Sequence, residues 1–257
     1  MTKENVEGQF SRVAKHYTTS AVHAKGEDLD AMVVAARLSG SELVLDAGCG
    51  AGHTALAFAP RVAEVWAYDL SRSMLDQVES LAQQRQITNV KTFQGDVERL
   101  PFDAQSVDLV VSRYSAHHWW YPEMALREFA HVLKPGGQFI LSDVVSYDDY
   151  IEDTFLQAIE LLRDPSHVRD HRVEEWQAMF AEAGFKSEVV LRFGVHLGFK
   201  SWLTRMATPD LNATLIRTLL AQAPQEVQAV FRLPKDWQTL DDFEFVLPGV
   251  VLRGTLA

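Results

Sequence analysis

The sequence predicts an α/β protein with a doubly wound, mostly parallel sheet, and two observations carry this prediction. Between residues 42 and 144, short apolar runs typical of buried strands alternate with amphipathic stretches typical of helices. The first of these runs leads directly into three glycines at alternate positions, Gly48, Gly50 and Gly52. Strand, glycine loop and helix in this order bring the backbone close to a small charged ligand.

The elements of the central part follow from these patterns. Strands are expected at 42–46, 64–69, 90–96, 107–113 and 137–144, and helices at 53–60, 71–85 and 122–133. Ser71 is expected to cap the helix that it begins, because a side-chain hydroxyl accepts from the free N–H groups of a first turn. Residues 134–137, KPGG, are a helix stop signal. A parallel sheet with right-handed crossovers follows from this alternation.

The two ends of the chain follow a different pattern. Residues 8–38 are expected to form two helices, the second beginning after Gly26. After residue 146, we expect helices at 149–163 and 173–183, a strand at 185–193, an all-helical insert at 199–232 and a last strand at 243–256. No repeat or long linker divides the chain, so a single domain over 1–257 is the simplest interpretation.

Composition limits the possible partners. The chain has 257 residues, of which 47% are hydrophobic and 23% charged, as in an ordinary soluble globular protein. A net charge of −11 argues against nucleic acid or an anionic membrane as the partner. No apolar stretch is long enough for a membrane span, and the N-terminus has no signal-peptide core. We therefore expect a cytoplasmic protein, monomer or homodimer, that acts on a small molecule, neutral or cationic.

The glycine loop differs from the dinucleotide fingerprint GxGxxG. Its third glycine comes one position early, and His53 stands where that fingerprint places the glycine of close helix packing. Residues 42–60 contain no Lys or Arg before Pro60 to neutralise a pyrophosphate, and no GKS or GKT follows the loop. Asp69, about 20 positions on, can accept hydrogen bonds from two ribose hydroxyls. The loop favours a ligand with ribose, an adenine-like base and little negative charge, and a dinucleotide is the weaker alternative.

Five segments in this order resemble a known family. They are LDAGCGAG (45–52), YDLSRSML (68–75), GDVERLPF (95–102), VDLVVSRYSAHHW (107–119) and LKPGGQFILSD (133–143). Together they resemble the class I S-adenosylmethionine-dependent methyltransferases, particularly the branch that includes ubiquinone/menaquinone-biosynthesis enzymes. The resemblance implies a Rossmann-like sheet of seven strands with an antiparallel C-terminal strand. It also implies S-adenosyl-L-methionine as the cofactor and S-adenosyl-L-homocysteine as its product.

The resemblance also implies roles for residues. Asp46, Gly48 and Gly50 border the methionine part of the cofactor, with the small Cys49 between the glycines. Asp69 holds the ribose, and Leu70 and Met74 pack on the adenine. Asp96 and the N–H of Val97 meet the polar edge of the adenine. Arg113 lies near the methionine part, and Tyr17 and Lys25 cover the cofactor. On this basis 1–38 is an N-terminal helical lead-in and 42–144 the cofactor-binding core. Helical inserts at 146–170 and 199–238 are expected to cap the substrate site.

An aromatic segment over 114–121, YSAHHWWY, follows the fourth predicted strand on the ligand-binding edge. It either anchors the following helix or forms a substrate-pocket wall, with His117 or His118 as base or hydrogen-bond donor. No metal site is expected, because the side chains of adjacent histidines diverge and no carboxylate is well spaced to complete one. His167 and His171 are four residues apart, but their polar neighbours indicate a loop or a helix start.

These observations predict S-adenosylmethionine-dependent methyl transfer to a small hydrophobic or aromatic acceptor, within EC 2.1.1.-. Three alternatives stay open. The chain could bind the cofactor without catalysis, or use the bound sulfonium as an electrostatic catalyst without methyl transfer. A dinucleotide-dependent oxidoreductase is the third. The acceptor itself is not encoded in any motif.

Overall fold

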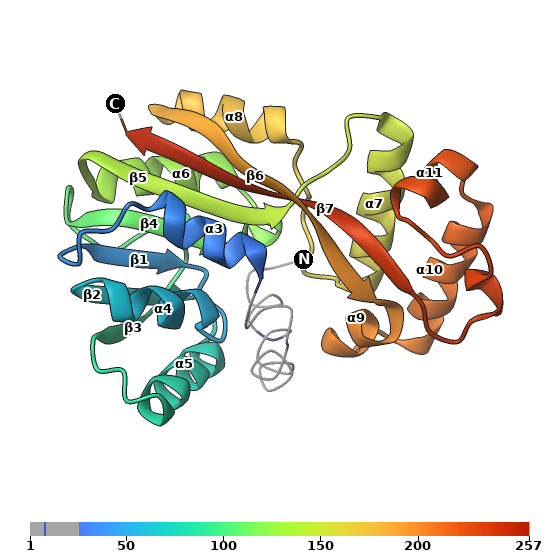
Figure 1. Ribbon diagram of the computed structural model, residues 1–257, viewed down its shortest axis with the longest axis horizontal. Coiled ribbons are helices and arrows are strands. Elements are labelled where there is room, and N and C mark those ends of the chain that lie inside the picture. The colour runs from blue at the N-terminus through green and yellow to red at the C-terminus, as the bar shows by residue number, and fades with distance from the viewer. Residues whose placement is uncertain (1–7, 9–25, 257) are drawn as a thin grey trace.

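A computed structural model describes residue 8 and residues 26–256 of the protein (Figure 1). The expected helix before Gly26, together with Tyr17 and Lys25, lies outside the described residues. Among the described helices, none combines the length and the apolar character needed to cross a membrane.

Seven strands form a single sheet in the order β3-β2-β1-β4-β5-β7-β6. The strands are β1 (Leu43–Ala47), β2 (Glu64–Asp69), β3 (Val90–Gln94), β4 (Val107–Arg113), β5 (Leu133–Val144), β6 (Phe185–Gly198) and β7 (Glu244–Leu256). The first five are parallel to one another, and β7 runs antiparallel between β5 and β6. The predicted fold class is therefore confirmed, including the antiparallel C-terminal strand.

Helices cover both faces of this sheet. One face packs against α3 (Glu27–Ala35), α4 (His53–Phe58) and α5 (Arg72–Gln84) through a buried apolar cluster. The other packs against α6 (Pro122–Val132) and α8 (Val173–Glu182) through a second cluster. Both faces of β4 are buried, which explains its continuous apolar run. This part of the molecule is the sheet body.

Several local predictions hold, with shifted boundaries. Ser71 caps α5 and accepts a hydrogen bond from the N–H of Met74. Helix α4 ends at Phe58, and a 3₁₀ turn, η1 (Ala59–Arg61), carries Pro60, which lacks the N–H that a longer helix needs. Helix α6 ends at Val132 as the KPGG signal requires, but β5 begins at once because Leu133 pairs with Val107.

Strands β6 and β7 run beyond the sheet body and carry a helical lobe, which is seen at the right of Figure 1. The lobe comprises α7 (Tyr150–Arg163), α9 (Phe199–Arg205), α10 (Asp210–Gln222), α11 (Gln225–Val230), the turn η3 (Trp237–Thr239) and the ends of β6 and β7. A third apolar core, which includes Phe199, Trp202 and Phe231, fills it. β6 is longer than predicted because it pairs with β7 as far as Gly198 and Glu244, burying Val195 and Leu197.

Candidate functional site

A cleft of about 960 Å³ lies at the carboxyl ends of the parallel strands. Its lining joins residues from four predicted segments: the glycine loop, the end of β2, the turn after β3 and the end of β4. The predicted residues that line it are Gly48, Cys49, Gly50, Asp69, Leu70, Met74, Asp96, Val97, Arg113 and His118. Ser115, Trp119 and Trp120 also line it, and they belong to the aromatic segment for which a substrate-pocket wall was one of two interpretations. His53 and Thr54 complete much of the wall and were not named as ligand-binding residues from the sequence.

The glycine loop depends on backbone that other residues rarely adopt. Gly48, Gly50 and Gly52 have φ values of 73°, 50° and 85°. A Cβ on Gly52 would lie 2.8 Å from Val78, so this glycine provides the close helix packing expected at the His53 position. A Cβ on Gly50 would meet nothing within 4 Å, which leaves its face open to the cleft. Burial raises the pKa of Cys49 well above its usual range, so its thiol stays neutral.

Asp69 fixes the loop and faces the cleft. One of its carboxylate oxygens accepts from the N–H of Gly50 and the other from the N–H of Ser71, both at 2.8 Å. Burial raises the pKa of Asp69, although these N–H groups oppose the shift. Each carboxylate oxygen retains a second lone pair, so Asp69 can also accept from a ligand hydroxyl.

Asp46 lies behind the loop rather than in the cleft lining. It is 1% exposed, and among the described residues neither carboxylate oxygen has a hydrogen-bond partner of good geometry. Burial raises the pKa of Asp46 to about 7, while the nearby N–H of Ala55 and the charge of Arg113 oppose this shift. Asp46 was expected to border the methionine part of the cofactor, and from this place it can act there only through the first turn of α4.

The turn after β3 lines the cleft and also holds the aromatic segment in place. Asp96 accepts a hydrogen bond from the N–H of Glu98 at 3.0 Å, as in a capped turn, and both Asp96 and Val97 line the cleft. The buried Glu98 accepts from the N–H groups of Trp120 and Tyr121 at 2.7 and 3.0 Å. Glu98 therefore holds the aromatic segment in place. No local pattern predicts this contact, because 22 residues separate Glu98 from Trp120.

Arg113 fastens α3 to the end of β4. Its Nε and Nη2 donate to the buried Asp28 carboxylate at 2.6 and 3.1 Å, and Ser142 also donates to Asp28. Its guanidinium lies 4.7 Å from the ring centroid of Tyr114. Arg113 lines the cleft as an already paired cation, and sequence reasoning did not identify Asp28 as its partner.

Tyr114 begins the aromatic segment in a strained conformation. Its φ is +52°, in the left-handed region that costs a bulky residue on the order of 1 kcal/mol. Tyr114 contributes to the walls of both the cleft and a second cavity of about 500 Å³. The strained residue therefore lies at the border of the two spaces.

The two candidate histidines differ in environment although their ring centroids are only 4.1 Å apart. His117 bonds Asp143 through Nδ1 at 2.7 Å and lines the second cavity. Burial alone lowers the pKa of His117, but the carboxylate of Asp143, reinforced by Asp170 and Glu160, raises it to about 9. His117 is therefore a cation at neutral pH and a hydrogen-bond donor rather than a base.

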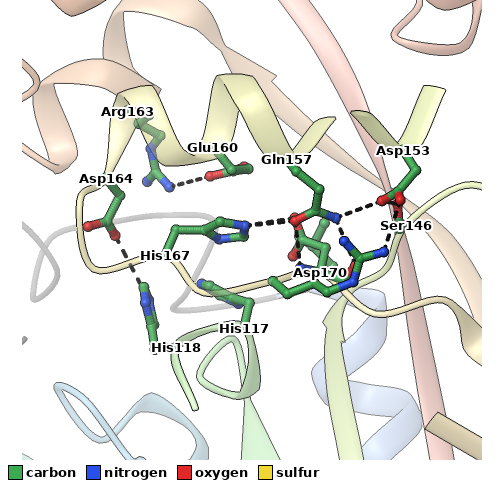
Figure 2. A network of polar contacts seen from close by, with 12 residues as sticks. His117, His118, Ser146, Asp153, Gln157, Glu160, Arg163, Asp164, His167 and Asp170 are labelled. Atoms are coloured by element: carbon green, nitrogen blue, oxygen red, sulfur yellow. Dashed lines mark hydrogen bonds and ion pairs between the residues drawn. The ribbon is translucent and has the colours of Figure 1, made fainter. Parts of the chain in front are cut away.

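His118 lines the cleft and is neutral. Its Nδ1–H donates to the carbonyl of Ser166 at 3.2 Å, and its Nε2 lies 3.9 Å from a carboxylate oxygen of Asp164 (Figure 2). Burial and the neighbouring charge of His117 lower the pKa of His118 to about 4. A neutral imidazole with Nδ1 protonated presents a lone pair on Nε2 and can take a proton.

Within the described residues, no group of three His, Cys, Asp or Glu side chains could hold a metal ion. His167 and His171 lie in the loop before α8, as their polar neighbours indicated. His167 bonds Gln157 through Nε2 at 3.0 Å, while His171 lies 3.6 Å from Glu175. Each of the two histidines thus has a partner of its own in the protein.

Known proteins with similar sequences and structures identify the family. The methyltransferase domain family matches residues 45–141. The uncharacterized methyltransferase YcgJ of Bacillus subtilis is 37% identical over 248 residues, 96% of this chain and 98% of YcgJ. The chain belongs to the class I S-adenosylmethionine-dependent methyltransferases. The uncharacterized protein YafE of Escherichia coli K12 is also similar, 42% identical over 74% of this chain and 91% of its own length.

Solved structures agree with this assignment. The crystal structure of YcgJ superposes with a TM-score of 0.85, at 35% identity, over 89% of this methyltransferase and 97% of that chain. A protein of Bacillus halodurans C-125 superposes with a TM-score of 0.82, at 30% identity, over 90% and 99% of the two chains. The shared architecture therefore extends through the helical lobe as well as the sheet body.

S-adenosylmethionine fits the residues of this methyltransferase. The open face of Gly50 admits a ligand against the backbone, and Asp69 has spare lone pairs for hydroxyl donors. Asp46 lies buried behind the loop, and a cationic ligand nearby would favour its ionised form. Among the described residues lining the cleft, Arg113 is the one Lys or Arg, and Asp28 already pairs with it. The described part of the lining therefore offers a pyrophosphate no unengaged cation.

Proposed function

We propose that this methyltransferase transfers a methyl group to a small hydrophobic or aromatic molecule. One observation carries the proposal: the cleft that contains the glycine loop and Asp69 is also walled by Tyr114, Trp119 and the neutral His118. An aromatic wall binds an apolar acceptor and excludes water, while a neutral imidazole beside it accepts a proton.

The chemistry divides between the cofactor and the chain. When bound, S-adenosylmethionine supplies a methyl group on a positively charged sulfur that is already a good leaving group. The protein then contributes position, desolvation and, for an acceptor that carries a proton, a base. Asp69 and the glycine loop orient the cofactor. His118 takes the acceptor proton on Nε2, and Asp164, 3.9 Å from that atom, stabilises the charge that forms.

Parallel titrations test the cofactor. Calorimetry with S-adenosylhomocysteine and with NAD should give saturable binding of the first and none of the second. Binding of NAD but not of S-adenosylhomocysteine would support the oxidoreductase alternative and reject this proposal.

Turnover tests the chemistry. A panel of phenols, enols and aromatic acids, incubated with methyl-labelled cofactor, should yield at least one methylated product. Cofactor binding without any product favours a non-catalytic protein, and an altered but unmethylated product favours electrostatic catalysis by the sulfonium. With a productive acceptor, His118→Ala should lower turnover by roughly 10²- to 10⁴-fold and leave the S-adenosylhomocysteine affinity unchanged. Full activity in that variant removes His118 from the chemistry.

A further inference from the structure

The second cavity lies between the sheet body and the helical lobe, at the border of the cofactor cleft. Tyr114 contributes to the walls of both spaces. Much of the second wall is apolar, and these side chains are Val144, Val195, Leu197, Trp202 and Leu247. The rest of the wall is polar and carries charged groups of both signs. A ligand of this cavity therefore needs an apolar body and a small polar group.

Asp170 is an unsatisfied acceptor in this wall. The residue is 1% exposed, and its Oδ2 has no hydrogen-bond partner among the described residues. The two hydrogen bonds that Asp170 forms with Gln157 involve its main chain only. Nε2 of His167 lies 3.9 Å from Oδ2 and bonds Gln157 instead (Figure 2). A carboxyl group accepts hydrogen bonds whether it is ionised or protonated, so Asp170 lacks a donor in either state.

Glu160 adds acceptor capacity to the same wall. It is buried, and its Oε2 accepts from Nη1 of Arg163 at 3.1 Å. A carboxylate has about four lone-pair sites, so this one bond leaves acceptor capacity unused. Arg163 also donates to the carbonyl of Trp202 at 3.1 Å, so the protein already engages this guanidinium. The wall therefore favours a ligand that brings a hydrogen-bond donor of its own.

His117 supplies a donor to the cavity. Its Nδ1–H donates to Asp143 at 2.7 Å, and Asp143 also accepts from the main-chain N–H groups of Ala116 and His117. These bonds hold the ring in one orientation. Among the described residues, no hydrogen bond involves Nε2 of His117, and no ion pair joins this ring to Asp170, although both residues line the cavity. The charge of Asp170 nevertheless acts on His117 and helps to raise its pKa, so the two groups are near neighbours across the space.

A hydroxyl is a small neutral group that can satisfy both residues. Its oxygen accepts from the imidazolium N–H, and its hydrogen is donated to the carboxyl group. A charged ligand of either sign meets like charges in this wall, since Glu160 and Asp170 oppose an anion while Arg163, Arg205 and His117 oppose a cation. An ether oxygen only accepts, and it would leave Asp170 without a donor.

We propose that the second cavity binds the hydroxyl group of a small apolar alcohol or phenol, with His117 as the donor and Asp170 as the acceptor. The carbon skeleton of this ligand packs on the apolar part of the wall, beside Val195, Leu197 and Trp202. The site goes beyond the proposed methyl transfer and does not depend on it, because none of these five residues lines the cofactor cleft.

Calorimetry with matched probes tests the proposal on the full chain, with and without S-adenosylhomocysteine. The probes are 3-phenylpropan-1-ol, its methyl ether, 3-phenylpropylamine and 3-phenylpropanoate, which differ only in the polar end. The alcohol should bind at least about tenfold more tightly than each of the other three. Equal or tighter binding of the ether, the amine or the acid overturns the proposal. The absence of saturable alcohol binding also overturns it, since the cavity then holds water only.

A variant of Asp170 locates the binding. Asp170→Leu keeps a similar side-chain volume and removes both acceptor oxygens, so it should weaken the alcohol about tenfold and leave the ether unchanged. Because Oδ2 is unsatisfied, the variant without ligand should resist urea at least as well as the wild type, whereas a purely structural role predicts a lower midpoint. Asp148→Leu is the matched control, because Asp148 is exposed and lies outside the cavity lining, and it should change neither affinity. Unchanged alcohol affinity in Asp170→Leu rejects the site.

A measurement on the wild type does not depend on any variant. In nitrogen-15 NMR spectra of the histidine side chains, the alcohol should shift the Nε2 resonance of His117 and leave that of the exposed His131 unchanged. An unmoved His117 resonance at saturating alcohol rejects the assigned donor.

The hydroxyl site and methyl transfer fail separately. If S-adenosylhomocysteine does not bind but the chain still prefers the alcohol, methyl transfer is rejected and the hydroxyl site stands. If S-adenosylhomocysteine binds and the chain shows no preference for the alcohol, the hydroxyl site is rejected and methyl transfer stands.

Discussion

The cofactor cleft and the second cavity are built by different means. The cleft presents backbone: three glycines with positive φ, and a carboxylate that holds the N–H groups of Gly50 and Ser71. The second cavity presents side chains from the segment after β4 and from β5, α7, β6, α9 and β7, on the border of another core. The comparison teaches that a ligand site made of backbone is encoded within a few consecutive residues. A site made of side chains depends on how distant elements pack.

The largest expected effect is a loss of stability in the helical lobe that leaves the sheet body folded. Trp202→Ala removes a large side chain, 1% exposed, from the core of the helical lobe, and should destabilise the lobe by ~3–5 kcal/mol. Hydrogen exchange should show lost protection in α9 and α10 and retained protection in β1 and β4. S-adenosylhomocysteine affinity should stay unchanged.

Trp202→Phe is the matched control for this experiment, because it keeps an aromatic ring in the core and should cost less. Loss of protection in the sheet body together with the lobe would contradict the comparison. It would show that the two cores unfold as one cooperative unit.

The next effect is confined to the cleft. Asp69→Ala removes the acceptor for two backbone N–H groups and for the proposed ribose contact, so S-adenosylhomocysteine affinity should fall by about 1.5–3 kcal/mol, roughly 10- to 100-fold. Asp76→Ala, an exposed aspartate on α5 that lies outside the cleft lining, is the control and should bind normally. Calorimetry measures both. Unaltered affinity in Asp69→Ala refutes the ribose assignment.

The division between a site made of backbone and a site made of side chains also separates what the sequence predicted from what it did not. Ser71 as a cap, the glycine loop, and the placement of Asp69 and Asp96 at the cleft follow from local patterns, because turns and caps involve residues a few positions apart. The ion pair of Asp28 with Arg113 joins residues 85 positions apart. Asp170 faces a cavity that no local pattern predicts. Such contacts are set by tertiary packing, which periodicity does not record.

The geometry distinguishes the two candidate histidines, and their catalytic role stays a prediction. The sequence offered His117 and His118 as equal candidates for a base, since both follow the same strand. The two rings do not diverge as expected, because their centroids lie 4.1 Å apart, but each ring meets a different carboxylate. The dinucleotide fingerprint places the glycine of close packing where this chain has His53, and the structure shows Gly52 in close contact with Val78 of α5 instead.

The smallest expected effect is a pH dependence of stability, which tests whether His117 carries a charge at neutral pH. Its pKa is about 9 in the folded protein against 6.5 ordinarily, so the folded state holds this proton more tightly. That stabilisation is complete below about pH 6.5 and is lost as the pH rises through about 9. Between about pH 7.5 and 8.5 the free energy of unfolding should fall by about 1 kcal/mol.

His117→Gln should remove this slope, measured by urea unfolding at each pH. The pH range of about 7.5 to 8.5 lies above the pKa of Asp46, which is about 7. His118 titrates far lower, near 4. An identical slope in wild type and His117→Gln would show that His117 is not the titrating group.

The pairing of Gly198 with Glu244 has a consequence for the origin of new specificities. Residues 199–243 leave β6 and return to β7 at directly opposed positions, so both ends of this segment are held by one pair of strands. A segment with equally spaced ends that also covers the apolar face of α7 can be exchanged there without altering the glycine loop or Asp69. The molecule is thus modular in the sense used by protein engineers: a different loop grafted between Gly198 and Glu244 redefines the outer wall of the second cavity and leaves the cofactor cleft intact.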